Sequence, residues 1–309
     1  MKAARIHRFG PPEVISLEDV APPAPAEEEV LVRVKAAGVG PWDAWVRAGK
    51  SVLPQPLPLT LGSDLSGSLV AVGSSVRAFE VGQEVFGVTN PRFTGAYAEY
   101  AVATAAMVAI KPRTLGHHEA ASLPVVAVTA LQMLFDHARL RPEHRVLVHG
   151  AGGNVGAYAV QLARREGANV VGTSTTRDVA FVNSLGVEEV IDTRSTSFEK
   201  VMEPVDVVID TVGGDVQARS FSVLKPGGVL VSSVSPPDPQ EASRRGVRAS
   251  FMLVDVTTKA LTRIAELIDA GQLTARVGQV LPLSDARRAH EMLDGLVPHE
   301  PGKIVLSLD

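Results

Sequence analysis

The chain has 309 residues, of which 45% are hydrophobic and 21% charged, and its formal net charge is −4. This composition is typical of a soluble globular protein with room for two domains, and it excludes the basic surface that nucleic acids or anionic membranes require. The absence of cysteine excludes disulfides and thiolate metal sites. Because the N-terminus lacks a signal-peptide core and no apolar run is long enough to span a membrane, we expect a cytoplasmic enzyme.

The first part of the chain, up to about Pro112, is rich in glycine and proline and predicts short strands. Alternating apolar and polar residues predict a half-buried strand at Glu29 to Lys35. Many turns between short strands indicate a mainly antiparallel, barrel-like domain. Further strands are expected at Leu69 to Val72, Val85 to Val88 and Tyr97 to Val102, and proline-rich loops at 21–25 and 53–58.

From about Ala120 the pattern changes to alternating helices and strands. Ala120 to Leu140 predicts a helical region interrupted near Pro124, and Thr257 to Ala270 predicts an amphipathic helix that ends at Gly271. Between them, apolar strands separated by possible crossover helices indicate a doubly wound parallel sheet. Its strands are expected at 146–148, 169–172, 190–191, 205–209, 229–232 and 247–254, and strands at 280–283 and 303–308 are expected to return to the first domain.

The sequence therefore predicts an α/β protein with a doubly wound parallel (Rossmann) sheet and a barrel-like, mainly β catalytic domain that is split in sequence. We place the catalytic domain at residues 1–120 and 256–309 and the nucleotide-binding domain at 121–255. No internal repeat or low-complexity segment interrupts this division.

A glycine-rich turn between a strand and a helix is the strongest functional signal. Arg145 to His149 predicts a buried strand, and Val155 to Glu166 predicts the helix that follows. A diphosphate must approach the backbone closely at a helix N-terminus, and glycine permits this approach. The spacing fits Ala151-x-Gly153-x-x-Gly156 better than the usual three-glycine pattern. In this context the turn predicts a dinucleotide site, rather than an ordinary glycine-rich turn.

The residues after the second strand favour NADPH over NADH. NAD-binding folds place an acid about 20 residues after the first glycine to bind the ribose 2′-hydroxyl. This chain has Thr173, Ser174, Thr175 and Arg177 there, and no acid before Asp178. Hydroxyl groups and a guanidinium can bind a 2′-phosphate, although Arg177 could also simply lie on a solvated helix start.

Several further motifs carry a resemblance to a known family. They are 62–67 (GSDLSG), 95–100 (GAYAEY), 120–124 (AASLP), 128–131 (VTAL), 210–214 (DTVGG) and 224–228 (LKPGG), together with the glycine turn. In this combination the whole chain resembles a medium-chain dehydrogenase/reductase of the zinc-free quinone oxidoreductase branch. The resemblance implies a barrel-like (GroES-like) domain, an NADPH-binding Rossmann domain, a homodimer, and NADPH-dependent reduction of quinones or activated alkenes.

The resemblance also implies roles for individual residues. Thr129 matches a threonine beside the nicotinamide or its ribose, and Arg194 could replace a tyrosine that relatives place near the adenosine phosphate, because Thr193 stands at that tyrosine's position. The residues expected to contact NADPH are Pro41, Thr129, Gly150, Ala151, Gly152, Gly153, Asn154, Val155, Gly156, Thr173, Ser174, Thr175, Arg177, Arg194, Val212, Gly213, Ser232, Ser233, Val234, Phe251 and Leu253.

No catalytic metal is expected. Zinc enzymes of this superfamily carry a cysteine and a Gly-His-Glu motif where this chain has Gly40 and Gly62-Ser63-Asp64. The eight histidines lack ligand spacing; His117 and His118 are expected on the surface before a helix, and His149 is expected to be structural. Alcohol oxidation needs a Lewis acid or a strong base, whereas a quinone or an enone accepts hydride more readily.

No catalytic residue is assigned in the part of the site that would bind the hydride acceptor. The pocket candidates are Trp42, Trp45, Asp64 and Thr129. Relatives have an asparagine at Gly40 and a tyrosine at Trp45, so the two tryptophans either form an apolar wall for flat acceptors or belong to the core. Asp43 is expected to cap a helix, and Asp64 to be a buried hydrogen-bonding residue.

Two alternatives to the reductase remain at this point. One is an NADPH-binding redox sensor or structural protein with little turnover, which the missing asparagine and tyrosine allow. The other is an enoyl thioester reductase, although no basic groove for a phosphopantetheine arm is evident. A homodimer is expected to form through the apolar segment from Ala249 to Val254.

Overall fold

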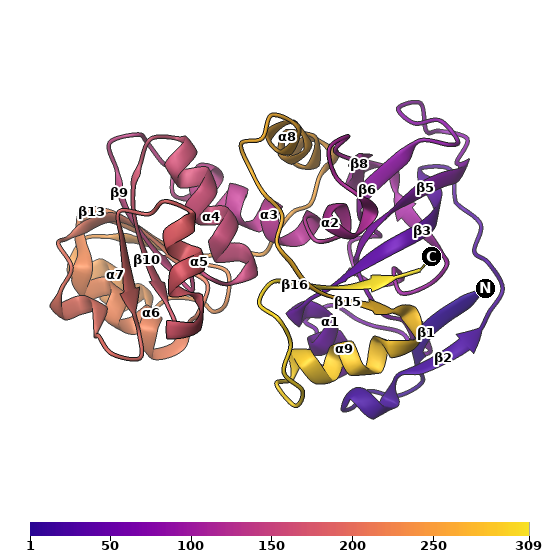
Figure 1. Ribbon diagram of the computed structural model, residues 1–309, viewed down its shortest axis with the longest axis horizontal. Coiled ribbons are helices and arrows are strands. Elements are labelled where there is room, and N and C mark those ends of the chain that lie inside the picture. Colours follow the sequence, from indigo (N-terminus) through magenta and orange to yellow (C-terminus); the bar gives the residue numbers. More distant parts are fainter. Residues whose placement is uncertain (309) are drawn as a thin grey trace. The chain divides into compact units, whose positions relative to one another are not determined.

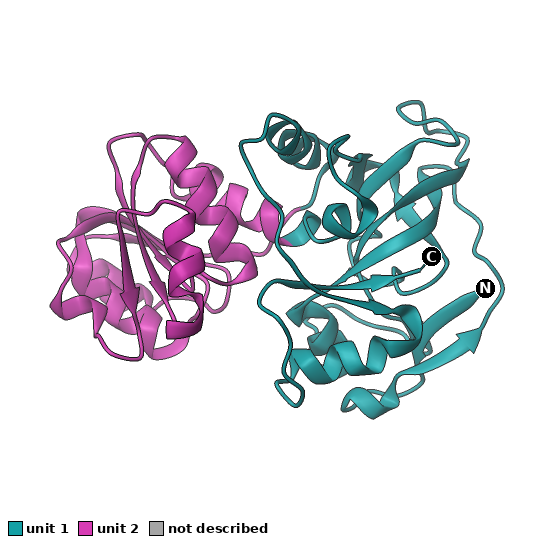
Figure 2. Cartoon of the chain, viewed as in Figure 1, with its two compact units in different colours: residues 1–125, 256–309 teal, residues 126–255 magenta. Residues whose placement is uncertain are grey.

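The computed structural model describes residues 1–308, which form two compact units. Unit 1 comprises Met1–Val125 and Val256–Asp309, and unit 2 comprises Val126–Asp255 (Figure 2). The first boundary thus follows Val125, whereas we expected it after Ala120. In residues 1–308 no helix is both long and apolar enough to cross a membrane.

Unit 1 is mainly β and is completed by the C-terminal segment (Figure 1). A seven-stranded sheet has the order β15-β16-β3-β5-β6-β8, with β7 paired to β3, and a three-stranded sheet has the order β2-β1-β4. The last strand, β16, pairs antiparallel with β3, which confirms that the fold is split in sequence. The strands are β1 Lys2–Ile6, β2 Ser16–Asp19, β3 Glu29–Val39, β4 Leu59–Thr60, β5 Asp64–Val72, β6 Glu84–Val88, β7 Tyr100–Thr104, β8 Val108–Ile110, β15 Val277–Pro282 and β16 Lys303–Ser307.

The helices of unit 1 are short except for α8. They are α1 Pro41–Arg47, α2 His117–Ala121, α8 Thr258–Asp269 and α9 Ala286–Leu293. Thr257 caps α8 by accepting a hydrogen bond from the amide of Ala260, and the buried face of this helix carries Leu261, Ile264 and Leu267. The expected helix at 257–270 is therefore present, and α1 supplies the helix start expected at Asp43, while α9 was not expected from the sequence.

Unit 2 is a doubly wound α/β fold. Its six strands have the order β11-β10-β9-β12-β13-β14, and every ladder is parallel. The strands are β9 Arg145–His149, β10 Asn169–Ser174, β11 Glu189–Asp192, β12 Val205–Asp210, β13 Leu224–Ser232 and β14 Arg248–Phe251. The helices are α3 Pro124–Gln132 (extended by a π-helical turn, Met133–His137), α4 Asn154–Arg165, α5 Val179–Ser184, α6 Gly214–Ser220 and α7 Pro239–Arg245.

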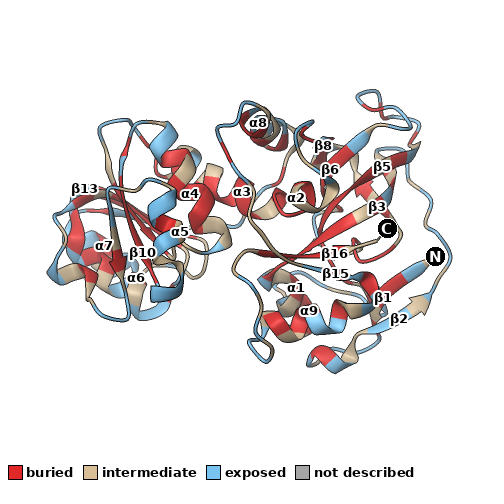
Figure 3. Ribbon diagram, viewed as in Figure 1, coloured by how far each residue is buried: buried red, intermediate tan, exposed pale blue. Residues whose placement is uncertain are grey.

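The centre of this sheet is fully apolar because helices cover both of its faces. Val146, Leu147 and Val148 of β9 and Val207, Val208 and Ile209 of β12 are completely buried (Figure 3). Because all six strands run in the same direction, their carboxyl ends meet at one edge of the sheet. In open α/β sheets this edge binds ligands.

Candidate cofactor and acceptor sites

The expected cofactor residues of unit 2 gather at the carboxyl edge of the sheet. Successive strands end at His149, Ser174, Asp192, Asp210 and Ser232. The predicted residues follow these ends directly, in the segments 150–156, 173–177, 194, 212–213, 232–234 and 251–253. The parallel topology therefore brings together residues that are up to about a hundred positions apart in the chain.

The glycine turn is tight enough to exclude side chains. Gly150 has φ +68°, in the left-handed region that favours glycine. A Cβ atom on Gly156 would lie 2.1 Å from the carbonyl oxygen of Gly150. Gly153 is the extended N-cap of α4, and Asn154 begins this helix. Free N–H groups at the start of a helix fit a diphosphate, so the geometry of the turn fits a dinucleotide.

Asp178 lies beside this turn, and this proximity was not predicted from the sequence. A Cβ atom on Gly152 would lie 2.5 Å from the Cβ of Asp178 and 3.3 Å from the hydroxyl oxygen of Ser174. Asp178 lies at the end of a 3₁₀ turn after β10, which folds back toward the glycine turn. Glycine at position 152 is thus required by packing between the turn and this segment.

Asp210 organises the two loops that are expected to line the cofactor. It is fully buried, and its Oδ1 accepts hydrogen bonds from the amides of Val212 (3.0 Å) and Gly213 (2.8 Å). Its Oδ2 accepts from Gln217 (3.0 Å) and from the hydroxyl of Ser232 (2.8 Å). One carboxylate therefore holds the ends of β12 and β13 in place. The sequence marked the DTVGG motif but did not show this role.

The remaining predicted cofactor residues vary in exposure. Val212 and Leu253 are largely exposed, Thr129 on α3 is buried, and Pro41 begins α1 of unit 1 with its side chain exposed.

The segments after β13 and around β14 are held by backbone hydrogen bonds. The amide of Ser233 donates to the carbonyl of Asp210, and the amide of Val234 donates to the Ser232 hydroxyl. The strand expected at 247–254 is shorter, because β14 ends at Phe251.

The region expected to hold the adenosine ribose contains both donors and an acid. Thr175 and Arg177 are exposed, whereas Ser174 is buried and donates its hydroxyl proton to the carbonyl of Thr175. Asp192, opposite Ser174 in the β10–β11 ladder, accepts hydrogen bonds from the Thr176 hydroxyl (2.7 Å) and from the amide of Arg194 (2.9 Å). These contacts, led by the Thr176 hydroxyl, lower the pKa of Asp192. This carboxylate was not predicted, because it lies on β11 and approaches the site only through the pairing of β10 and β11.

His149 is a structural residue, as the sequence predicted. It is completely buried at the end of β9, where its two ring nitrogens lie 3.0 Å from the Thr173 hydroxyl and 2.9 Å from the Ser220 hydroxyl. Burial lowers its pKa from 6.5 to about 4. The neutral ring therefore joins β9, β10 and α6 beneath the glycine turn.

Unit 1 contains a buried ion pair close to the end of β3. The Nζ of Lys303 lies 2.8 Å from Asp64, and both side chains are almost completely buried. Asp64 also accepts a hydrogen bond from the amide of Val125 (3.1 Å). Asp64 is thus a buried hydrogen-bonding residue, as predicted, but its cationic partner at the far end of the chain was not anticipated.

Asp43 lies in the same polar cluster. Its Oδ2 accepts hydrogen bonds from the amide of Gly40 (2.8 Å) and from the hydroxyl of Tyr97 (3.0 Å), so it closes the first turn of α1 as predicted. Burial raises the pKa of Asp43 to about 7, although the nearby Lys303 acts in the opposite direction. Burial also raises the pKa of Tyr97 well above its usual value. The carboxyl of Asp43 is therefore easier to protonate than an exposed aspartate.

The two tryptophans of α1 differ in environment. Trp42 packs partly against the core of unit 1 and meets Phe93 edge-to-face, with ring centroids 6.0 Å apart. Trp45 is 49% exposed, so the alternative that it belongs to the core is wrong. In the described residues the indole Nε1 of Trp42 is buried without a hydrogen-bond partner. Trp45 is therefore a surface residue, whereas Trp42 packs partly against the core.

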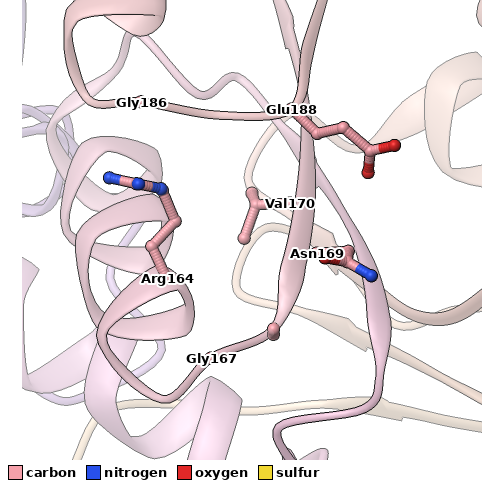
Figure 4. A pocket seen from close by; sticks show the side chains of 7 residues that line it. Arg164, Gly167, Asn169, Val170, Gly186 and Glu188 are labelled. Atoms are coloured by element: carbon pink, nitrogen blue, oxygen red, sulfur yellow. The ribbon is translucent and has the colours of Figure 1, made fainter.

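A separate hollow in unit 2 has a volume of about 250 Å³ and is lined by residues other than the predicted ones (Figure 4). Asn169 and Val170 at its wall begin β10, so it borders the amino edge of the sheet, opposite the carboxyl edge. The guanidinium of Arg164 donates to the carbonyl of Leu185 there (2.7 Å). This hollow is therefore not the predicted cofactor site.

His117 and His118 lie within a helix and are half-buried, whereas we expected surface residues before a helix. Both belong to α2 and are half-buried: His117 lies 2.9 Å from the Ser66 hydroxyl and His118 lies 3.1 Å from the Ser307 hydroxyl. Within residues 1–308 no group of three or more His, Asp or Glu residues could hold a metal ion. With Gly40 and Ser63 at the ligand positions of the zinc enzymes, the residues present do not fit a catalytic zinc ion.

Comparison with known proteins agrees with this architecture. Residues 26–113 match the family described as alcohol dehydrogenase GroES-like domain, and residues 185–306 match zinc-binding dehydrogenase. A quinone oxidoreductase from Sus scrofa is 33% identical over 94% of this chain and 93% of its own length.

The chain belongs to the medium-chain dehydrogenase/reductase superfamily, in its quinone oxidoreductase branch. The solved structure of a quinone oxidoreductase from Coxiella burnetii has a TM-score of 0.93 and 34% identity, covering 100% of this chain and 99% of that one. The Escherichia coli quinone oxidoreductase, solved in complex with NADPH, has a TM-score of 0.88 and 28% identity, covering 99% and 100%. The protein is therefore an oxidoreductase similar to the quinone oxidoreductases.

The neutral state of buried His149 predicts a pH dependence of stability. In the unfolded chain the imidazole has an ordinary pKa of 6.5, but in the folded chain the pKa is about 4. The unfolded state therefore binds the extra proton first, and the free energy of unfolding falls as the pH drops from about 6.5 to about 4. In a His149→Gln variant this part of the pH dependence should be reduced, as measured by urea unfolding at several pH values. His118→Gln serves as a control, and equal pH profiles for the wild type and His149→Gln would contradict the assignment.

Proposed function

We propose that the protein transfers hydride from NADPH to a quinone or to an activated alkene such as an α,β-unsaturated carbonyl compound, without a metal ion. The observation that carries this proposal is the tight glycine turn at the carboxyl edge of the parallel sheet. In addition, Gly40 and Ser63 stand at the positions where zinc enzymes of the superfamily have metal ligands. The names of the relatives from Sus scrofa and Coxiella burnetii support a quinone as the acceptor.

The residues of unit 2 would hold the dinucleotide. Backbone N–H groups at the start of α4 would bind the diphosphate, and the loops held by Asp210 would line the nicotinamide half. When bound, the cofactor supplies a hydride for a two-electron reduction. The protein contributes orientation and exclusion of water, which suits an acceptor that is already electron-poor.

NADPH rather than NADH is supported by the charges near the second strand. Thr175 and Arg177 are exposed at the end of β10, and Arg194 is exposed just after β11. A guanidinium binds a phosphate with charge-assisted hydrogen bonds. Asp192 acts against this preference because its negative charge lies beside Thr176. We therefore propose a preference for NADPH that is moderated by Asp192, and the NADPH complex of the Escherichia coli relative agrees with it.

The first experiment is stopped-flow oxidation of NADPH, with NADH in parallel, against a panel of quinones and enones. We expect rapid, acceptor-dependent oxidation of NADPH by one of the two classes. Tight NADPH binding without oxidation by any acceptor would instead favour the redox sensor or structural protein. Oxidation only by an enoyl thioester would favour the third alternative.

Two charge variants test the cofactor preference. Removing the guanidinium in Arg177→Ala should weaken NADPH binding about tenfold and leave NADH binding within about twofold, because a charge-assisted hydrogen bond contributes about 1.5–3 kcal/mol before solvent screening. Asp192→Asn should raise the ratio of NADPH to NADH affinity. Both are measured by fluorescence titration of the reduced cofactors. Equal losses for both cofactors in Arg177→Ala would show that this arginine does not contact the 2′-phosphate.

We also propose a homodimer formed through β14. This strand is an edge of the six-stranded sheet and pairs on one side with β13. Its residues Ala249, Ser250 and Phe251 are only half-buried. An edge strand with free N–H and C=O groups is suited to pairing with a second copy across a twofold axis.

A proline at Phe251 should weaken this dimer without opening the sheet. The amide of Met252 donates to the carbonyl of Ser232, so the alternation along the strand directs the Phe251 amide toward the free edge. Phe251→Pro should therefore shift sedimentation toward the monomer at micromolar concentration while the far-UV spectrum is kept. Ser250→Pro, which would remove a donor to β13, should instead destabilise the fold. An unchanged sedimentation coefficient for folded Phe251→Pro would argue against this interface.

A further inference from the structure

The side chain of Gln217 connects the two loops that follow β12 and β13 in unit 2. It belongs to α6 (Figure 1) and is only 6% exposed. Its Nε2 lies 3.0 Å from Oδ2 of Asp210, 2.9 Å from the carbonyl oxygen of Ser235 and 3.3 Å from the Ser235 hydroxyl oxygen. One buried amide therefore joins the carboxylate at the end of β12 to the loop after β13.

The chemistry of these neighbours decides which residue can stand at position 217. The two closest groups, the Asp210 carboxylate and the Ser235 carbonyl, accept hydrogen bonds, and a primary amide nitrogen has two N–H groups to donate. If the amide were turned over, its oxygen would face both acceptors and the contacts would be repulsive. Position 217 thus needs two donors on one atom, which glutamine supplies and the similarly shaped glutamate does not.

The loop 232–235 is anchored at its two ends by different residues. At its start, the Ser232 hydroxyl and the Ser233 amide both donate to Asp210. Within the loop, the amides of Val234 and Ser235 donate to the Ser232 hydroxyl at 3.2 and 3.3 Å, which fixes the turn but not its position. At its far end, Gln217 holds the Ser235 carbonyl.

The sequence after Ser235 makes this last anchor important. The next two residues are Pro236 and Pro237, and proline has no backbone N–H group. The chain therefore cannot donate a backbone hydrogen bond again until Asp238, which caps α7. The bond from Gln217 is thus placed at the point where the loop would otherwise begin to separate from the sheet.

The two loops also contact each other directly. Gly213 has φ +77°, and a Cβ atom there would lie 2.8 Å from Cγ1 of Val234 and 3.4 Å from the Ser235 hydroxyl oxygen. Val234 therefore occupies the space that a side chain at position 213 would need. A shift of the loop 232–235 would open this contact, so the bond from Gln217 to Ser235 keeps the loops together.

We propose that Gln217 is a positioning residue for the nicotinamide half of the cofactor. This inference rests on the proposed function, in which the loops after β12 and β13 line that half. Gln217 acts through Ser235 and Asp210: it holds the loop 232–235 in the one conformation that the nicotinamide half meets. The adenosine half is proposed to lie at the glycine turn and the end of β10, where Gln217 has no described contact. The two halves should therefore respond differently to its loss.

The expected size of the effect follows from the population of the anchored loop. When only a fraction of the molecules has the binding conformation, the apparent affinity falls by that fraction. A loop that is anchored in a tenth of the molecules would thus bind the nicotinamide half about tenfold more weakly. An anchored loop also loses less conformational freedom when the cofactor binds.

Two probes separate the halves of the cofactor in a calorimetric titration. NADPH carries both halves, whereas adenosine 2′,5′-bisphosphate carries only the adenosine half with its phosphates. Gln217→Leu should weaken NADPH binding about tenfold and change bisphosphate binding by less than about twofold. The variant is expected to fold because Asp210 keeps its donors from Val212, Gly213 and Ser232. A general loss of structure would weaken both probes equally, and that result would refute the proposal.

A matched control is available on α4 of the same unit. The side-chain amide of Gln161 donates to the carbonyl of Ala157, one turn earlier in its own helix. Gln161→Leu makes the same chemical change without touching either loop, so it should bind both probes as the wild type does. An equal loss of NADPH affinity in Gln161→Leu and Gln217→Leu would show that the loop anchor is not the cause.

A glutamate variant tests the hydrogen bond rather than the packing. Gln217→Glu keeps the shape of the side chain but places a carboxylate against Asp210 and the Ser235 carbonyl. Burial and the nearby acid favour protonation of this new carboxyl group, which can then donate one hydrogen bond again. The loss of NADPH affinity relative to the wild type should therefore shrink between about pH 8 and about pH 6. A relative loss that stays constant over this range would count against the proposal.

These outcomes distinguish this inference from the proposed function. Failure of the wild type to bind NADPH would overturn the proposed function, and the role of Gln217 with it. Normal NADPH binding by the wild type and by both Gln217 variants would remove only the role of Gln217.

Discussion

Unit 1 depends on the meeting of two segments from opposite ends of the chain. Strand β16 pairs with β3, and Lys303 at its start forms a buried ion pair with Asp64 at the start of β5, 239 residues away. Both charges are nearly excluded from solvent, so removal of either partner would leave an uncompensated charge in the core. The whole of unit 2 is inserted between these segments. Strand β16, which follows unit 2 in the sequence, must therefore pair with β3 in the correct register.

In unit 2 the important features are the common direction of the strands and two buried polar residues. Its parallel strands bring their carboxyl ends to one edge, where the glycine turn leads into the N-terminus of α4, a position suited to binding an anion. Two buried polar residues make this edge rigid. His149 connects β9 to Thr173 and Ser220, and Asp210 anchors the loops after β12 and β13. Both act through hydrogen bonds in an apolar sheet, where such bonds are strong.

The sequence predicted the elements whose patterns are local. The strand–turn–helix from Arg145 to Arg165, the parallel strands and helix α8 follow from apolar runs, glycine positions and helical periodicity, and the structure confirms them. Helix α9 was missed because it has only eight residues and several of them are charged. Strands β1 and β2 were missed because each has five residues or fewer, and β2 has a single apolar residue.

From the sequence, the candidate site could be predicted only where a single short motif contains all of the residues concerned. The glycine turn could be located by its spacing, but Asp192 could not, because its proximity to Thr176 arises from the register between β10 and β11. The same holds for Lys303, which lies beside Gly40 only because β16 joins β3. Residues that act from neighbouring strands require the tertiary structure, whereas residues within one turn do not.

The positions that hold zinc ligands in related enzymes lack those donors in this chain. Where those enzymes carry cysteine and histidine, this chain has Gly40 and Ser63, and the acid that follows, Asp64, is paired with the buried ammonium of Lys303. The second oxygen of Asp64 accepts a hydrogen bond from the amide of Val125, so both oxygens of this carboxylate are already engaged within unit 1. A carboxylate in such a pair could bind a metal ion only by giving up its buried partner, so the ion pair and the two substitutions act in the same direction, against metal binding at this position.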